Sequence, residues 1–145
     1  MIPTVIRVLD PTVPLRIIVI DSIDGDGFAR RLAEASDATL RVVVVGIAAT
    51  AHDGPQLVDE LGPDVVVIGT TLPDRPGIEA IQEIRLVSRS VPVISLTTTE
   101  SNNEFFAVLV AGASAYVAHD VQNTRLLDRI RRSAMGDYPI NDLSV

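Results

Sequence analysis

The sequence contains no cysteine, no lysine and no tryptophan among its 145 residues. The absence of cysteine excludes disulfide scaffolds, thiolate zinc sites and thiol nucleophiles. Histidine occurs only at His52 and His119, which argues against a metal site built from several histidines. Aromatic residues make up 3% of the chain, so few side chains are present on which single-stranded nucleic acid could stack.

Long apolar runs and positive charge are also scarce. No run reaches the roughly 18 residues that a membrane span requires, and the N-terminal residues 1–10 lack the basic region of a signal peptide. The formal net charge is −7 and the pI is about 4.6, so the surface repels phosphate backbones. We therefore expect a cytoplasmic domain that contacts neither a membrane nor nucleic acid directly.

Two patterns alternate along the chain. Short apolar runs that are rich in β-branched residues and bounded by Gly, Pro or Asp predict strands buried on both faces. These runs are 15–20, 40–46, 64–68, 91–96 and 115–118. Between and after them, apolar residues recur at helical spacing, in the sets Phe28, Leu32, Ala35; Leu57, Val58, Leu61; Ile78, Ile81, Ile84; Phe105, Phe106, Leu109; and Leu126, Leu127, Ile130, Ala134.

Repeated strand–helix units predict an α/β fold. Parallel strands need crossover helices, and right-handed crossovers place those helices on both faces of the sheet. We expect a three-layer, doubly wound, flavodoxin-like fold with a five-stranded parallel sheet and five helices. The domain should cover residues 15–136, where Gly136 breaks the last helix. Residues 1–14 would form an N-terminal arm, either frayed or an added sheet edge or dimer contact, and 137–145 the start of a C-terminal linker.

Functional groups in such folds lie at the carboxyl ends of the strands. The residues that converge there are Asp21, Gly69, Thr97 and His119. Asp21, Asp24 and Asp26 are weak candidates for a Mg²⁺ site, and a solvated turn is the alternative because turns favour Asp and Gly. His119 is open to three interpretations: a metal ligand, a pH-sensitive plug over the pocket, or a hydrogen-bonded loop histidine.

Several segments carry a family pattern when they are taken in order. They are Asp21, 63–69 (PDVVVIG), Pro73, 77–80 (GIEA), 93–97 (VISLT) and 111–119 (AGASAYVAH). Together they resemble a response-regulator receiver domain over about residues 15–136, and the ending 130–142 is similar to receivers that precede a LuxR-type helix-turn-helix. The resemblance implies a CheY-like fold. It also implies two acids that hold Mg²⁺, an aspartate phosphorylated by a histidine kinase, and a Thr or Ser and a Lys that contact the phosphoryl group.

The sequence departs from this family at three positions. Ser22 stands at the position of the second acid, Gly69 at that of the phosphoacceptor aspartate, and His119 at that of the lysine. Because Gly69 has no side chain, no acyl phosphate can form there. Thr97 and the family's switch aromatic, Tyr116, are retained.

The resemblance and the departures together predict a pseudo-receiver that is not an enzyme. In the family, the residues at the positions of Thr97 and Tyr116 relay the state of the site to one face of the domain. That face is made by the fourth helix, the fifth strand and the fifth helix. We expect this domain to bind a protein partner or itself, with a homodimer favoured. It would be the regulatory part of a transcriptional response regulator in a two-component system, with DNA bound by a downstream helix-turn-helix.

Two alternatives stay open at this point. The vacant pocket of Asp21, Ser22, Gly69, Thr97 and His119 would suit a small molecule or an anion, because the glycine leaves space and removes negative charge. Residual phosphorylation is the other alternative, although Asp74 lies past Pro73 and should point away from the strand end. No cofactor is expected: the loop 21–27 lacks the histidine of cobalamin-binding loops, and the chain has no G-x-S-x-G nucleophile elbow.

The last predicted helix is rich in arginine. We expect its cationic side chains to form a solvated face paired with nearby acids, and not a DNA-binding surface; they are Arg125, Arg129, Arg131 and Arg132.

Overall fold

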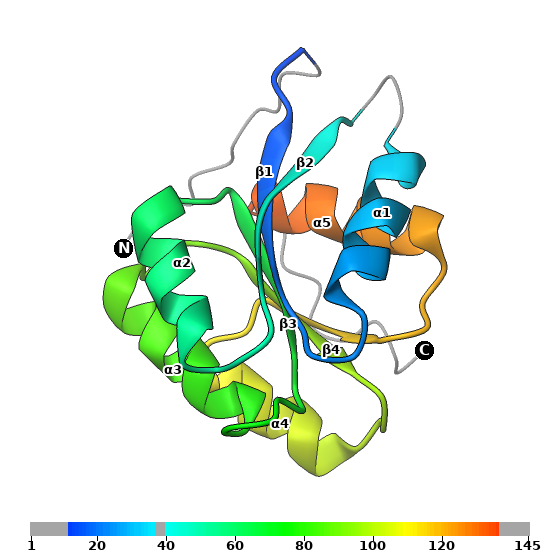
Figure 1. Cartoon of the computed structure of the whole chain (residues 1–145). Coiled ribbons are helices and arrows are strands. Elements are labelled where there is room, and N and C mark those ends of the chain that lie inside the picture. The colour runs from blue at the N-terminus through cyan, green and yellow to red at the C-terminus, as the bar shows by residue number, and fades with distance from the viewer. Residues whose placement is uncertain (1–11, 37–39, 137–145) are drawn as a thin grey trace, which may run out of the picture.

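The computed structural model describes residues 12–36 and 40–136. Strands and helices alternate strictly along these residues (Figure 1), as β1 (Leu15–Ile20), α1 (Gly25–Ala35), β2 (Val42–Ala48), α2 (Asp53–Leu61), β3 (Val65–Gly69), α3 (Gly77–Val87), β4 (Val93–Thr97), α4 (Asn102–Ala111), β5 (Ala115–Ala118) and α5 (Asn123–Ala134). The strands form one parallel sheet in the order β2-β1-β3-β4-β5. The predicted doubly wound α/β fold is confirmed.

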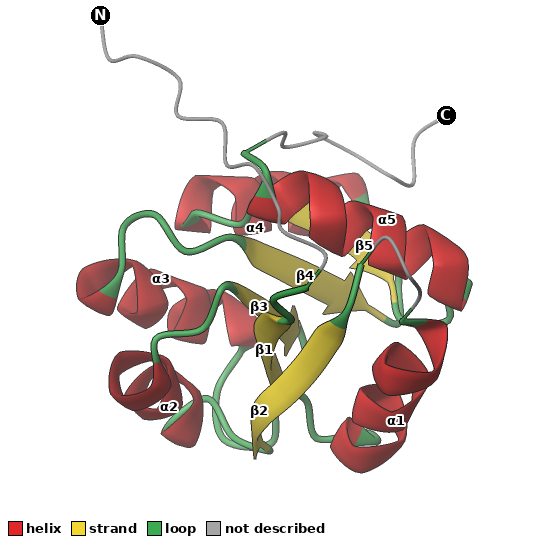
Figure 2. Cartoon of the chain, turned by 90° about the horizontal axis from the view of Figure 1, so that it is seen from above, coloured by secondary structure: helices red, strands yellow, loops and turns green. Residues whose placement is uncertain are grey.

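The sheet separates two apolar cores. On one face, Val58 of α2, Ile81 of α3 and Val108 of α4 pack in a single cluster. On the other face, Phe28 of α1 and Leu126 of α5 pack in a second cluster. Figure 2 shows the sheet lying between α2 and α3 on one side and α1 on the other. Because helices cover both faces, the inner strands are apolar throughout: every residue of β3 and β4 is buried.

Strand β2 differs from the sequence prediction. It begins at Val42 and continues to Ala48, whereas residues 40–46 were expected. Its pairing with β1 shifts between Ile17 and Ile18, so that Val45 has no partner there and the strand bulges. The added residue moves the end of the strand, and the loop that faces the site starts after Ala48. As an edge strand, β2 is only partly covered, and Val43 and Ile47 are exposed.

Helix α4 also corrects the sequence analysis. Phe106 was grouped with Phe105 on the buried face, but it is 62% exposed, and Val110 one turn later is 88% exposed. Phe105, Val108 and Ala111 form the buried face instead. The error arose because α4 is apolar on nearly all sides, and periodicity then cannot select the face that packs against the sheet.

The arginines of α5 fall into two groups. Arg131 and Arg132 pair with Asp128 at N–O distances of 2.6 and 3.1 Å, as expected for a solvated helix face. Arg129, in contrast, is only 8% exposed, so the expectation of a fully solvated face is wrong at that residue.

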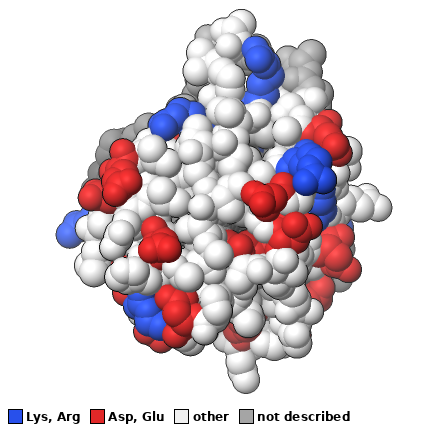
Figure 3. All heavy atoms as spheres, in the orientation of Figure 1, with Lys and Arg blue, Asp and Glu red and all other residues white. Residues whose placement is uncertain are grey.

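Seen from the side of Figure 1, cationic and acidic side chains are scattered among uncharged ones, and the cations form no continuous stripe (Figure 3).

Residues 1–11 of the expected arm and the whole of the expected linker, 137–145, lie outside the described residues. Within the described ranges, no helix combines the length and apolar character that a membrane crossing needs.

Candidate functional site

The carboxyl ends of the strands bring together the predicted residues of the site. Asp21 directly follows β1, Gly69 ends β3, Thr97 ends β4 and His119 directly follows β5. Gly69 and Thr97 therefore belong to the strands themselves, one residue later than the sequence suggested. Parallel pairing fixes their heights, since Gly69 lies beside Leu96 and Thr97 beside Ala118.

A hydrogen bond between Asp21 and His119 closes the centre of this site. His119 Nε2 lies 2.9 Å from Asp21 Oδ2, and the Asp21 side chain is fully buried while that of His119 is 19% exposed. An ionised carboxylate can only accept hydrogen bonds, so Nε2 donates. The second carboxylate oxygen, Oδ1, lies 3.4 Å from the backbone N–H of Ile23. Of the three interpretations of His119, this contact is the one expected of a hydrogen-bonded loop histidine.

Gly69 lies directly beneath this pair. A Cβ atom built on Gly69 would be 3.0 Å from Asp21 Oδ1, closer than Cβ atoms normally approach other atoms. A larger side chain at this position therefore requires Asp21 to move. The depression lined by Asp21, Gly69, Thr70 and His119 has essentially no interior volume for a water-sized sphere. The space that the glycine was expected to leave is absent, because Asp21 and His119 fill it.

His119 is held from the side by α1. Its ring lies 6.0 Å from the ring of Phe28, centroid to centroid. The Arg31 guanidinium lies over the Phe28 ring, with its central carbon 5.4 Å from the ring centroid. Arg31 also donates to the Val121 carbonyl oxygen and the Asn123 side chain at 2.7 and 2.8 Å. No local sequence pattern indicates this role of Arg31, because its partners are about 90 residues away.

The acidic residues of the loop after β1 lie in different surroundings. Asp24 caps α1, accepting a hydrogen bond from Gly27 N at 3.0 Å, and Asp26 is exposed in the first helical turn. Ser22 is exposed as well. Across the described parts of the chain, no group of three or more His, Cys, Asp or Glu side chains is placed to hold a metal ion. The structure thus assigns Asp24 to helix capping.

Thr97 turns toward its own loop. Its hydroxyl donates to the Thr99 carbonyl oxygen at 2.8 Å and accepts from Thr99 N at 3.1 Å. The neighbour that lines the depression is Thr98. Helix α4 is capped by Ser101, which accepts from Glu104 N at 3.0 Å. Thr97 and Thr99 therefore shape the loop that leads into α4, whereas the N-cap of that helix is Ser101.

Tyr116 connects this loop to α4. The residue is 1% exposed, and its hydroxyl donates to Glu104 Oε1 at 2.8 Å and lies 3.4 Å from Ser101 N, which donates to it. Its ring packs against Phe105 with centroids 5.8 Å apart. Burial raises the pKa of Tyr116 above its usual value, so the hydroxyl keeps its proton. Tyr116 thus holds the first turn of α4 against β5.

Asp74 points away from the site, as the sequence analysis expected. Its carboxylate accepts hydrogen bonds from Ala51 N at 2.9 Å and His52 N at 3.0 Å, just before α2. These bonds, with that from Ala51 the largest, lower the pKa of Asp74. No sequence signal could identify this role, because the partners precede Asp74 by more than 20 residues.

A close backbone contact fixes the loop between β3 and α3. A Cβ atom on Gly77 would be 2.2 Å from the Gly69 carbonyl oxygen, and Gly77 N donates to the Thr70 carbonyl oxygen at 2.9 Å. Only a glycine fits this approach.

This arrangement, a five-stranded parallel sheet with its site at the switch between β1 and β3, defines a doubly wound, flavodoxin-like α/β domain. Residues 17–131 match the family model of the response regulator receiver domain. The chain belongs to this family, and the fold is the CheY-like fold of its solved members.

Solved and curated relatives agree with this assignment. A two-component response regulator of the LuxR family from Aurantimonas sp. SI85-9A1 superimposes with a TM-score of 0.78 at 30% identity, covering 87% of this chain and 89% of that one. The transcriptional regulatory protein LiaR of Bacillus subtilis is 28% identical over 123 residues, covering 85% of this chain and 57% of LiaR. The nitrate/nitrite response regulator NarL of Escherichia coli K12 is 24% identical over 101 residues, covering 70% and 47%.

The chain thus spans about half the length of these curated relatives. Some other relatives are enzymes by name. A protein-glutamate methylesterase/protein-glutamine glutaminase of Hahella chejuensis is 31% identical over 140 residues, which cover 90% of this chain but only 36% of that protein.

Proposed function

We propose that this receiver domain signals without an aspartyl phosphate and acts by binding a protein partner or a second copy of itself. In this proposal it is a non-enzymatic, cytoplasmic regulatory part of a two-component transcriptional regulator. DNA contact would belong to a downstream helix-turn-helix outside these 145 residues.

The observation that carries the proposal is the Asp21–His119 bond above Gly69. Phosphoryl transfer needs an in-line oxygen nucleophile and cations that neutralise the oxygens of the transferred group. The position of the nucleophile here is a glycine, and the position of the cation is a histidine already bound to the remaining acid, at 2.9 Å. The nearby carboxylate of Asp74 is hydrogen-bonded to the start of α2 instead.

The proposal is tested by incubating the protein with Mg²⁺ and acetyl phosphate and then measuring its intact mass. We expect no phosphoryl adduct. A relative that has the acceptor aspartate, treated in parallel, verifies the donor. An adduct that hydroxylamine removes would show an acyl phosphate and would overturn the proposal.

A triple variant, Gly69→Asp with Ser22→Asp and His119→Lys, restores all the missing groups and removes the histidine that holds Asp21. We expect it to gain an adduct, whereas Gly69→Asp alone should not, because the second acid and the lysine that the family resemblance implies are still missing at residues 22 and 119.

Two alternatives have less support. A small molecule above Gly69 lacks room, because the depression there is filled by Asp21 and His119. Residual phosphorylation lacks an acceptor at the strand end.

The outward face of α4 is the surface that we propose for self-association. Phe106 and Val110 lie one turn apart and are 62% and 88% exposed, and their helix is tied to β5 through Tyr116. Large exposed apolar side chains side by side are typical of interfaces. Association through this face would bury both side chains at once.

We expect a dimer by analytical ultracentrifugation without any phosphodonor, and a monomer for Phe106→Asp combined with Val110→Asp. Leu86→Asp is the matched control, because Leu86 is an equally exposed leucine, at 86%, on α3. A monomeric unmodified protein, or a dimer that survives the α4 substitutions, would contradict this part of the proposal.

A further inference from the structure

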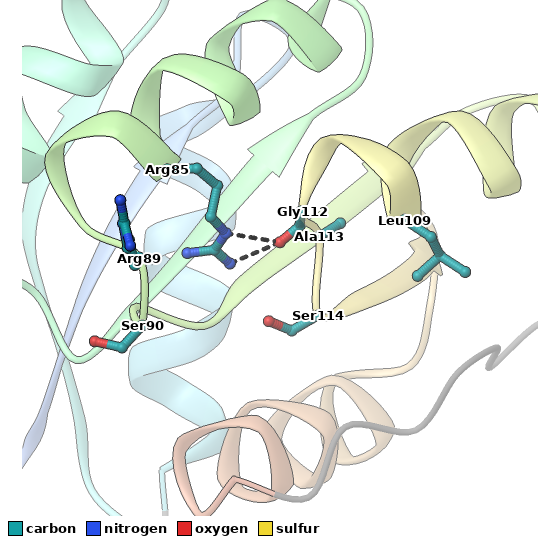
Figure 4. A pocket seen from close by; sticks show the side chains of 7 residues that line it. All are labelled: Arg85, Arg89, Ser90, Leu109, Gly112, Ala113 and Ser114. Atoms are coloured by element: carbon teal, nitrogen blue, oxygen red, sulfur yellow. Dashed lines mark hydrogen bonds between the residues drawn. The ribbon is translucent and has the colours of Figure 1, made fainter. Parts of the chain in front are cut away.

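A surface hollow lies between the carboxyl-terminal ends of α3 and α4, at the sheet edge opposite the site described above. Its volume is about 440 Å³, and we call it the α3–α4 groove; its lining includes Arg85, Arg89, Ser90, Leu109, Ala113 and Ser114. In Figure 4, Arg89 and Ser90 lie on the side of the hollow next to the end of α3, and Leu109 and Ser114 lie on the side of α4 and the start of β5. Nothing in the receiver chemistry uses this groove.

Two arginines make the groove basic. Arg85 donates to the Gly112 carbonyl oxygen from Nε at 2.9 Å and from a terminal nitrogen at 2.7 Å, and to the Val91 carbonyl oxygen at 2.7 Å. Its stem packs so closely on Gly112 that a Cβ there would be 2.8 Å from it. Arg89, on the opposite rim, is exposed. Among the described lining residues there are two arginines and no carboxylate, although the whole chain carries a charge of −7.

The segment that follows α5 has the complementary character. Residues 137–145, which lie outside the described residues, read DYPINDLSV, with two carboxylates, no cation and several apolar side chains. Such a segment matches a groove that has arginines on its rim and Leu109 and Ala113 in its lining.

The topology brings the two together. Each helix of a β–α repeat returns to the edge where the strands begin, so α5 ends at the same edge as the groove. Ser114, which lines the groove, directly precedes β5, and β5 is the outermost strand. To reach the groove, the chain that leaves α5 has to pass only the start of β5. Nine fully extended residues span at most about 30 Å.

We propose that residues 137–145 dock in the α3–α4 groove of their own domain. Docking would fasten the exit of the chain to α4, the helix held by Tyr116, and would fix the direction in which anything that follows is presented. The inference does not depend on the proposed function, because a phosphorylatable receiver could use the same groove.

Cysteine cross-linking tests this directly, since the chain has no cysteine of its own. Ser90→Cys is combined with Ser144→Cys, and the matched control combines Ser22→Cys, an exposed serine near the other edge, with Ser144→Cys. A disulfide needs Cα atoms within about 7 Å. In dilute protein we expect the first pair to form an intrachain disulfide on the order of tenfold faster than the control pair, as docking raises the effective concentration.

Charge reversal separates docking from simple tethering. Arg89→Glu should slow the Ser90→Cys/Ser144→Cys reaction about threefold to fivefold, the effect of one exposed charge pair. Adding Asp137→Arg and Asp142→Arg to that protein should restore the rate. Equal rates for the two cysteine pairs, or a fast reaction insensitive to charge reversal, would overturn the proposal. A disulfide that joins two chains would assign the groove to a second copy and would also overturn it.

Discussion

At the scale of the residue, His119 makes a structural contact at the centre of the site. It binds Asp21, whose side chain is fully buried. A buried carboxylate is costly unless it is hydrogen-bonded. His119 supplies that hydrogen bond at 2.9 Å and therefore offsets part of this cost.

We predict that His119→Ala lowers the free energy of unfolding by about 1–3 kcal/mol, the usual cost of leaving a buried acceptor without its partner. Urea denaturation followed by circular dichroism measures the change. His52→Ala is the matched control, because His52 is exposed beside α2, and should change stability little. The double variant Asp21→Ala with His119→Ala should be less destabilised than the sum of the single variants. Additive effects would show that the two side chains do not act as a pair.

At the scale of the element, loops are fixed by contacts to distant parts of the chain. The two ends of the loop between β3 and α3 meet where Gly77 approaches Gly69. Within the loop, the Asp74 carboxylate accepts hydrogen bonds from the backbone just before α2. Hydrogen bonds from the backbone N–H groups of Ala51 and His52 favour the ionised form of Asp74, and the first of them contributes most to its lowered pKa.

This sets a direction for the pH dependence of stability. Because the folded-state pKa of Asp74 is lowered from about 3.8, its contribution is fully present above the unfolded pKa and is lost as the pH falls through the folded value. We predict that Asp74→Asn has a lower melting temperature than the unmodified protein at pH 7. The difference should shrink as the pH falls below about 4.

Differential scanning calorimetry at both pH values measures this difference. Asp59→Asn, an exposed aspartate on α2, serves as the control and should show little difference at either pH. A melting-temperature gap for Asp74→Asn that is the same at pH 7 and below pH 4 would contradict the assignment.

At the scale of the whole molecule, stability is concentrated in the centre of the sheet. Every residue of β3 and β4 is buried, and both strands are paired on two sides. Strand β2 is an edge strand with a bulge at Val45 and a partly exposed surface. Regions with fewer buried contacts open more easily by local fluctuation.

We predict that the backbone amides of β3 and β4 exchange with solvent slowest, close to the rate set by global unfolding, and that those of β2 around Val45 exchange much faster. Native-state hydrogen exchange followed by NMR measures these rates residue by residue. Uniform protection across β2 and β3 would contradict this distribution of stability.

The sequence by itself determined the order of the elements, the fold and the residues at the strand ends. Five apolar runs separated by amphipathic segments have one common solution, and that topology places Gly69 at the carboxyl end of a strand. These properties follow from local periodicity and from topology, which both lie in the linear order of the residues.

Only the tertiary structure decided which side chains lie over Gly69. The hydrogen bond between Asp21 and His119 joins residues 98 positions apart. Arg31 and Asp74 also bind partners that are distant in the sequence, which local patterns do not reveal. The exposure of Phe106 and the bulge in β2 also arise from packing, because an apolar helix and an edge strand each allow more than one arrangement. Contacts between distant segments depend on how the elements pack, and no local spacing specifies them.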